Sequence, residues 1–203
     1  MHIDKETYKI SKDNHYKTKT VKTQIVIGTS LRKNNNHITR LQHKDYGKTK
    51  KWNTYTISRE GKIFQHYDDK FHSDFLGVKE GDKRSISIVL ENMGCLFETV
   101  NGKYINWLNE FCDNENVVEK EWLDYDFWEN FPDIQIDSLI SLIEILCEKH
   151  NIPKNFIEFR TYHKKTYNFK GIVFRGNYVE DSSDMNPLFN VYQLNEMLCN
   201  GIS

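Results

Sequence analysis

The sequence predicts an α/β fold in which a mixed central β-sheet is flanked by helices. Three observations lead to this fold class. The segment QIVIG at Gln24–Gly28 is a short β-branched run, Thr54–Tyr67 alternates apolar and polar residues around a turn, and a long amphipathic stretch follows Asp137. Short strands combined with one long amphipathic helix are typical of a sheet that has helices packed on it.

Each predicted strand has a local signal. The apolar run that closes at Gly28 predicts a buried strand ending at the edge of a pocket. The turn Arg59-Glu60-Gly61 divides the alternating segment into a β-hairpin. High β-propensity predicts two more strands. In order, the predicted strands are Gln24–Gly28, the two halves of Thr54–Tyr67, Ser85–Asn92 and Gly171–Arg175.

The clearest helix is capped by Asp137 and ends before Asn151 and Pro153. Its apolar residues recur at helical spacing and predict a core helix: Leu139, Ile140, Leu142, Ile143, Leu146 and Cys147. A last helix is predicted at Val191–Cys199, and a weak helical pattern covers His37–His43. The acidic, aromatic stretch Tyr104–Phe131 is expected to contain pieces of helix.

Composition limits the function classes. A chain of 203 residues fits one domain over 21–203, preceded by a polar arm at 1–20 that is either extended or loosely docked. The net charge of -1 gives no overall attraction to nucleic acid. A mean hydropathy of -0.71 and the lack of a long apolar run argue against a membrane span. The four cysteines show no metal-binding spacing and are expected to be free thiols.

The order of three motifs resembles the type 2 N-acetylmuramoyl-L-alanine amidases and the peptidoglycan recognition proteins that share their fold. The motifs are QIVIGTS at Gln24–Ser30, TYTISREGKIFQHYDD at Thr54–Asp69, and GIVFRGNY…DMNP within Gly171–Pro187. The sequence is most similar to amidase-like proteins of bacteriophages. The resemblance implies the amidase fold over about Val21–Asn190 and a peptidoglycan fragment as the ligand.

The resemblance also implies where a metal would be held. Family members bind Zn²⁺ through two His and one Asp or Cys, and a metal-bound water attacks the amide between muramic acid and L-alanine. Here Gly28 stands at the first His, and Arg175 stands at the second, or Phe174 if the register slips by one. Neither Gly nor Arg is a plausible zinc ligand. Asp184 is the single candidate ligand that remains.

We therefore expect a degenerate zinc site that binds a ligand, with no catalytic residue and no cofactor. Arg175 suits a carboxylate or phosphate, or alternatively pairs with Asp184 as a structural link. Gly28 either lets a ligand approach closely or ends the strand. Asn53 stands at the family's supporting tyrosine. The predicted ligand-binding residues are Gly28, Asn53, Arg175, Asn177, Ser182 and Asp184.

Two other functions remain open. The chain is alternatively an active, endolysin-like cell-wall amidase whose zinc is held by other residues, such as His37 or His66. It is otherwise a virion structural or assembly protein that contacts other phage proteins through residues 1–20. Because no signal peptide or membrane span is visible, host cytoplasm or virion is the expected location. Nucleic acid and membrane are not expected partners.

Several residue groups have two interpretations each. His66 and His72, with Asp68 and Asp69 between them, either form a relocated metal site or lie at the surface. Glu91 and Asn92 either point into the groove or cap its edge. The following aromatic residues form either a stacking floor or part of the core: Tyr55, Phe64, Tyr67, Trp107, Trp122 and Trp128.

Overall fold

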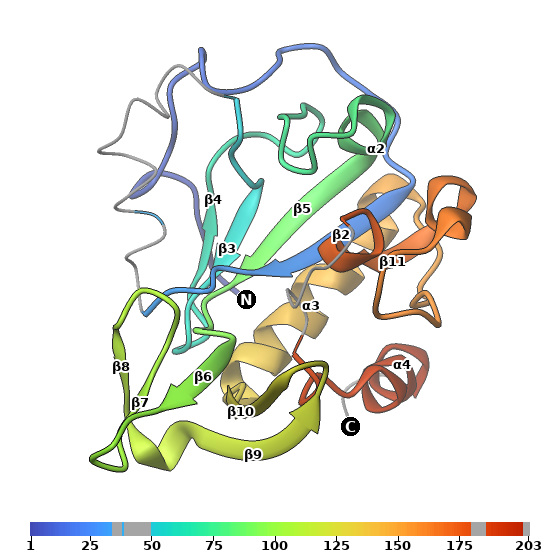
Figure 1. Ribbon diagram of the computed structural model, residues 1–203. Coiled ribbons are helices and arrows are strands. Elements are labelled where there is room, and N and C mark those ends of the chain that lie inside the picture. Colours follow the sequence, from blue (N-terminus) through green and yellow to red (C-terminus); the bar gives the residue numbers. More distant parts are fainter. Residues whose placement is uncertain (34–37, 39–49, 180–185, 201–203) are drawn as a thin grey trace.

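The computed structural model describes residues 1–33, 38, 50–179 and 186–200, which form two β-sheets with helices packed against them (Figure 1). The larger sheet has six strands in the order β1-β4-β3-β5-β2-β11. Their bounds are β1 Ile3–Asp4, β2 Gln24–Thr29, β3 Tyr55–Ile57, β4 Ile63–Gln65, β5 Ser85–Leu90 and β11 Gly171–Phe174. These confirm the strands and the hairpin predicted from sequence, and the mixed α/β fold class.

Strands β3, β5, β2 and β11 are mutually parallel, whereas β4 runs antiparallel to β3. The carboxyl ends of four neighbouring strands therefore meet at one edge of the sheet. In α/β folds this edge is where ligands usually bind, because loops from several strands converge there. Short helix α2, Lys79–Arg84, leads into β5 at the opposite edge.

One face of this sheet is apolar and packs on α3, Asp133–His150 (Figure 1). The face is formed by Ile25, Ile27, Tyr55, Ile57, Ile86, Ile88 and Leu90, all at most 2% exposed. The predicted helix is confirmed, but it begins at Asp133 rather than at Asp137. Pro132 precedes its first turn, where no N–H donor is needed. Helix α4, Val191–Asn200, is also as predicted.

The helix pieces predicted within Tyr104–Phe131 are wrong except for a single 3-10 turn at Asn114–Asn116, because the stretch mainly forms strands of a second, five-stranded sheet in the order β8-β7-β6-β10-β9. The stretch contains two valines and eight aromatic residues, which favour pleated sheet over helix. The strands are β6 Cys95–Glu98, β7 Tyr104–Ile105, β8 Phe111–Cys112, β9 Val117–Trp122 and β10 Tyr125–Glu129. A small core of Met93, Leu96 and Cys112 lies beneath it.

Residues 1–20 are docked along β4 and the loop that follows it. The Ile10 amide donates to the His66 carbonyl at 3.0 Å, and the Tyr16 amide donates to the His72 carbonyl at 2.8 Å. The ring of His15 stacks on Tyr67. The helix predicted at His37–His43 lies outside the described residues except for Ile38. Within the described parts of the chain, no helix has the length and apolar character needed to cross a membrane.

Candidate functional site

The second face of the six-stranded sheet carries polar side chains. Alternation along the strands places Gln24, Thr54, Thr56, Ser85 and Ser87 on this face, and all are buried. We call it the polar face. Near the carboxyl edge, strand register aligns one row of residues across four strands, running from Phe64 through Thr56 and Val89 to Gly28.

Gly28 and Arg175 directly follow the last paired residues of β2 and β11. Phe174 pairs with Ile27 across these parallel strands, and Gly28 and Arg175 are the next residues along the chain. Strand β11 ends at Phe174, so Arg175 lies in the turn after it. Gly28 does not end its strand, because β2 continues to Thr29. The Gly28 position is buried, whereas Arg175 is only half-buried. Arg175 is therefore the more exposed of these two residues.

The two residues considered for the second His position, Phe174 and Arg175, lie in different surroundings. Phe174 is fully buried on the apolar face, where its ring lies 5.9 Å from that of Phe156 and 5.7 Å from that of Phe189. Arg175 instead begins the short 3-10 helix Arg175–Asn177, and its guanidinium lies 5.3 Å from the centre of the Phe75 ring. Arg175 also makes a contact beyond this one, so it is not a free cation.

Asn53 joins the row through Thr56. Its side-chain amide donates to the Thr56 hydroxyl at 2.8 Å and to the Tyr55 carbonyl at 2.6 Å. The Thr56 hydroxyl lies 2.8 Å from Nε2 of His66, whose Nδ1 lies 2.9 Å from the Tyr8 carbonyl. Because a carbonyl only accepts, Nδ1 donates, and in the neutral ring Nε2 accepts from Thr56. The polar face is thus linked by hydrogen bonds to the docked arm.

Asn177 lies beyond the row and is fully buried. Its amide oxygen accepts from the Phe174 amide at 2.7 Å, and its amide nitrogen donates to the carbonyls of Phe159 and Thr161 at 2.7 and 2.9 Å. These bonds fix the turn that places Arg175. Ser182 and Asp184 lie outside the described residues, as does the pairing of Arg175 with Asp184.

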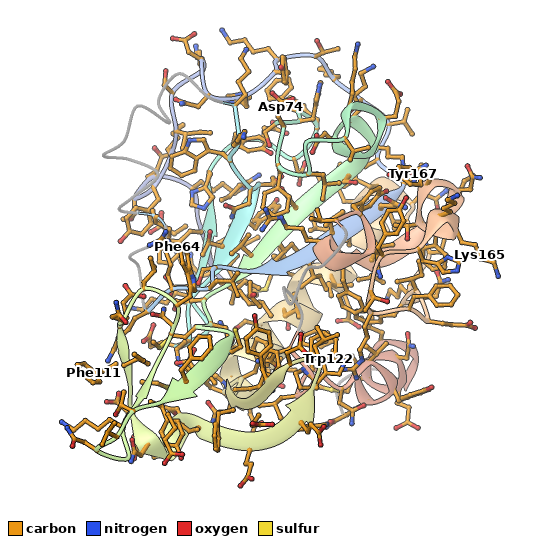
Figure 2. The ribbon with its side chains drawn as sticks, in the orientation of Figure 1. Phe64, Asp74, Phe111, Trp122, Lys165 and Tyr167 are labelled. Carbon is orange, nitrogen blue, oxygen red and sulfur yellow. The ribbon has the colours of Figure 1, made fainter. Side chains whose placement is uncertain are left out.

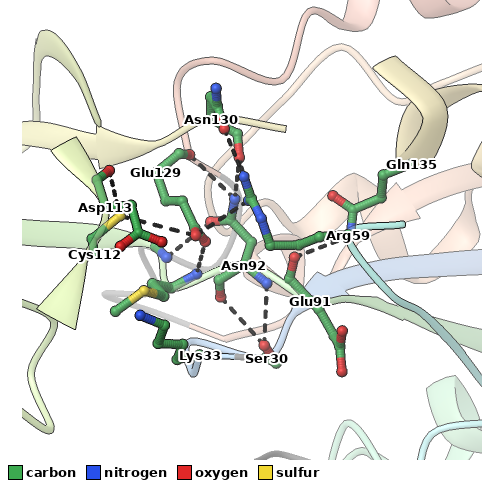
Figure 3. Close-up of polar contacts among 12 residues, drawn as sticks. Ser30, Lys33, Arg59, Glu91, Asn92, Cys112, Asp113, Glu129, Asn130 and Gln135 are labelled. Carbon is green, nitrogen blue, oxygen red and sulfur yellow. Dashed lines mark hydrogen bonds and ion pairs between the residues drawn. The ribbon is translucent and has the colours of Figure 1, made fainter. Parts of the chain in front are cut away.

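The carboxyl edge also holds two buried carboxylates (Figure 3). Glu129 pairs with Arg59 at 3.3 Å and accepts from the Met93 amide at 2.6 Å, which ties the hairpin turn to the second sheet. Glu91 is 2% exposed, and one of its carboxylate oxygens has no hydrogen-bond partner. Burial, then repulsion from Glu60, raises the pKa of Glu91 to about 7. Its carboxylate points away from the Arg59–Glu129 pair in Figure 3.

Asn92 caps this edge. Its side-chain amide donates to the carbonyls of Glu129 and Asn130 at 3.2 and 2.9 Å, and its amide oxygen accepts from the Gly94 amide. The capping interpretation therefore holds for Asn92. For Glu91, the sequence signal was its position directly after a strand, and the structure buries it with one carboxylate oxygen unpaired.

The described residues at the row do not fit zinc. Gly28, Val89 and Arg175 have no suitable donor atom, and both ring nitrogens of His66 are already hydrogen-bonded. Across the described ranges, no group of three or more His, Cys, Asp or Glu side chains is arranged to hold a metal ion. His37 and Asp184 lie outside those ranges.

The remaining metal and nucleophile candidates have other partners. Asp68 pairs with Lys70, and Asp69 accepts from Tyr55 and Lys149 at 2.8 Å each. Burial raises the pKa of the Cys112 thiol to about 12, and that of the Cys147 thiol to about 11, which disfavours the nucleophilic thiolate.

The aromatic residues divide between core and surface. Tyr55, Phe64, Tyr67 and Trp128 are buried, which is the core-packing outcome. Trp122 is half-buried, and its ring is tilted against that of Trp128, with the ring centres 5.5 Å apart. Trp107 is 55% exposed, and its indole N–H donates to the Leu31 carbonyl at 3.0 Å, close to the end of β2. Of these six rings, Trp107 is the one most available to a ligand.

Comparison with known proteins agrees with this architecture. The family model described as N-acetylmuramoyl-L-alanine amidase matches residues 17–171, which is most of the chain. The chain belongs to this amidase family. The matched range includes Gly28 and Asn53 and ends before Arg175. No curated protein sequence matches the chain.

Solved structures of amidases share the fold. The amidase LysC from Clostridium intestinale has a TM-score of 0.56 and 14% sequence identity, with 98% of each chain covered. A mutant endolysin from Bacillus subtilis has a TM-score of 0.58 and 12% identity, covering 98% of this chain and 99% of that one. The E. coli amidase AmiD, in complex with anhydro-N-acetylmuramic acid-L-Ala-D-gamma-Glu-L-Lys, has a TM-score of 0.56 and 15% identity. The match covers 89% of this chain and 58% of the AmiD chain. The fold is therefore that of the endolysin-type amidases.

Proposed function

We propose that this chain is an amidase-family protein that binds a peptidoglycan fragment at the carboxyl edge of its sheet without zinc-dependent hydrolysis. The observation that carries the proposal is that Gly28 and Arg175 directly follow Ile27 and Phe174, which pair across the neighbouring strands β2 and β11. By the family resemblance, these are the positions of the two histidine ligands. With glycine and arginine at these positions, the protein has a guanidinium cation of its own where family members hold a zinc ion.

The chemistry of Arg175 favours an anionic ligand group. A guanidinium has five N–H donors in a planar fork that matches a carboxylate, so a ligand can share it with existing protein contacts. The hydrogen bonds of Asn177 hold the turn in which Arg175 lies, and the Phe75 ring flanks its guanidinium. Muramyl peptides carry carboxylates on their peptide stem, as the substrate named in the AmiD complex does.

The test is calorimetric binding of anhydro-N-acetylmuramic acid-L-Ala-D-gamma-Glu-L-Lys to the full chain. We expect saturable binding that Arg175→Met weakens about 10- to 100-fold, because one charge-assisted hydrogen-bonded contact is lost. Lys170→Met is the matched control, since Lys170 is an exposed cation just before β11. Equal affinity in wild type and Arg175→Met would contradict the proposed role of Arg175.

Incubation of the same ligand with the protein, followed by mass spectrometry, separates binding from hydrolysis. The proposal predicts that the amide between muramic acid and L-alanine stays intact with or without a chelator. Cleavage that stops on chelation would establish the zinc amidase with relocated ligands instead.

A further inference from the structure

The N-terminal arm is attached to the domain through two ring stacks of reciprocal composition. His15 of the arm stacks on Tyr67 of the domain, with ring centres 4.9 Å apart and ring planes 10° apart. Tyr16 of the arm stacks on His72 of the domain, at 4.8 Å and 18°. The Tyr16 hydroxyl also donates to Asp74 at 3.0 Å, at the top of the molecule in Figure 2. Neighbouring arm residues thus form two stacks, and each stack contains one histidine.

The surroundings of His72 favour its neutral ring. The residue is 8% exposed, and burial lowers the pKa of the ring, as do the ammonium groups of Lys22 and Lys83. A hydrogen bond with the main chain of Thr18 and the carboxylate of Asp74 act on this pKa in the opposite direction. Among the described residues, the buried Nδ1 has no hydrogen-bond partner. Protonation of both ring nitrogens therefore leaves at least one buried N–H without an acceptor.

His15 lies in surroundings of the same kind. It is 7% exposed, and burial lowers the pKa of its ring, with further contributions from the charges of Lys17 and Lys50. A hydrogen bond with the main chain of Ser11 and the carboxylate of Asp68 oppose this decrease. Its Nδ1 is also buried and has no partner in the described part of the chain. Both stacks are thus built for neutral imidazole rings.

The other contacts of the arm are mainly with main-chain groups at the edge of the sheet. Strand β1 pairs with β4 over two residues, and the arm is the dark blue trace in Figure 1. Among the described contacts with the main core, the arm contributes Ile3. Because so little apolar area holds the arm, its docking is sensitive to a change of charge in the two stacks. Three arm amides donate to carbonyls of the domain, Ile10 to His66, Tyr16 to His72 and Thr20 to Lys70, at 3.0, 2.8 and 3.1 Å.

We propose that the arm is released by acid: protonation of His15 and His72 undocks residues 1–20 from β4 and the loop that follows it, while the rest of the domain stays folded. Once the arm is released, both rings are exposed to water, and their pKa values return toward the ordinary value of 6.5. The docked state therefore binds protons less readily than the released state. Docking is strongest above pH 6.5 and weakens as the pH falls below it.

Release of the arm also reaches the polar face through His66. In the docked state, Nδ1 of His66 donates to the Tyr8 carbonyl at 2.9 Å, and Nε2 accepts from the Thr56 hydroxyl at 2.8 Å. Loss of the Tyr8 carbonyl removes the acceptor that fixes which ring nitrogen carries the proton. The hydrogen bonds of Thr56, and through it of Asn53, then depend on the position of the arm.

The test is hydrogen exchange of the full chain, measured by ¹H–¹⁵N NMR at pH 7 and pH 5 and expressed as protection factors, which remove the intrinsic pH dependence of exchange. We expect protection of the Ile10, Tyr16 and Thr20 amides to fall about 10- to 100-fold, because two rings must be kept neutral below their ordinary pKa. Protection of the Ile88 amide in the sheet should not fall. The raised pKa of Glu91 stabilises the domain as pH falls through 7.

The double variant His15→Gln/His72→Gln has neutral side chains in both stacks, so protection of the arm amides should be the same at pH 7 and pH 5. His2→Gln is the matched control, because His2 is an exposed histidine of the same arm, and this variant should behave like wild type. A docked double variant that keeps the pH dependence would overturn the role of the two histidines.

If the double variant does not dock, the wild-type profile decides by itself. Arm protection that is equal at pH 7 and pH 5 would overturn the proposal. Arm protection that falls together with that of Ile88 would also overturn it, because the whole domain would then be unfolding.

Discussion

The two faces of the six-stranded sheet come from the same strands but are stabilised differently. The apolar face packs Ile25, Ile27, Ile86 and Ile88 against α3. The polar face buries hydroxyl and amide groups that reach partners far away in the sequence, as when Gln24 donates to the carbonyls of Thr166 and Phe169 at 2.8 Å each. The first face depends on area removed from water, and the second depends on donor and acceptor pairing. The candidate site lies on the second face.

The comparison predicts the largest loss of stability for a truncation on the apolar face. Ile88→Ala removes a fully buried side chain and leaves a cavity, so the free energy of unfolding should fall by about 2–5 kcal/mol. Chemical denaturation measures it. The control is Ile145→Ala on α3, where the side chain is 43% exposed and a change below about 0.5 kcal/mol is expected. Similar losses in both variants would contradict the assignment of the core.

Glu91, at the edge between the two faces, should make the stability of the protein depend on pH. Its folded pKa of about 7 lies above the ordinary value of 4.5, so its contribution to stability is full below 4.5 and is lost as pH rises through 7. Glu91→Gln should therefore stabilise the protein by about 2–3 kcal/mol at pH 8 and change little at pH 4. Denaturation across pH measures this, with exposed Glu119→Gln as control. A constant difference at all pH values would refute it.

The hydroxyl of Thr56 tests whether hydrogen bonding stabilises the polar face. Thr56→Val keeps the shape of the side chain but removes the partner of His66 and Asn53, which should cost about 1–3 kcal/mol. Thr56→Ser retains the hydroxyl and should lose clearly less. If both variants are equally stable, packing rather than pairing holds this face together.

The same contrast explains what the sequence predicted. Alternation and β-branched runs located the strands, and the spacing of Leu139, Leu142 and Leu146 located α3, because burial of apolar area leaves a periodic pattern. The second sheet was missed, since valine and tryptophan in an acidic stretch give no clear period. The bonds of Asn177 and the docking of residues 1–20 were also not visible, because pairing over long sequence distances leaves no local signal.

The candidate site was predicted in part. The positions of Gly28 and Arg175 came from the family resemblance, and in the structure both directly follow the paired residues Ile27 and Phe174. The burial of Asp82 was not foreseen, because Asp82 lies in a charged helix and only the fold buries it.

The most direct test of the central claim is the metal content of the full chain, purified without added zinc and measured by elemental mass spectrometry. A site built around Gly28 and Arg175 predicts far less than one zinc per chain. It also predicts that Arg175→His, which restores one ligand type, raises zinc binding little without a second histidine at Gly28. Near-stoichiometric zinc in the wild-type protein would contradict the account and make amidase activity the leading function.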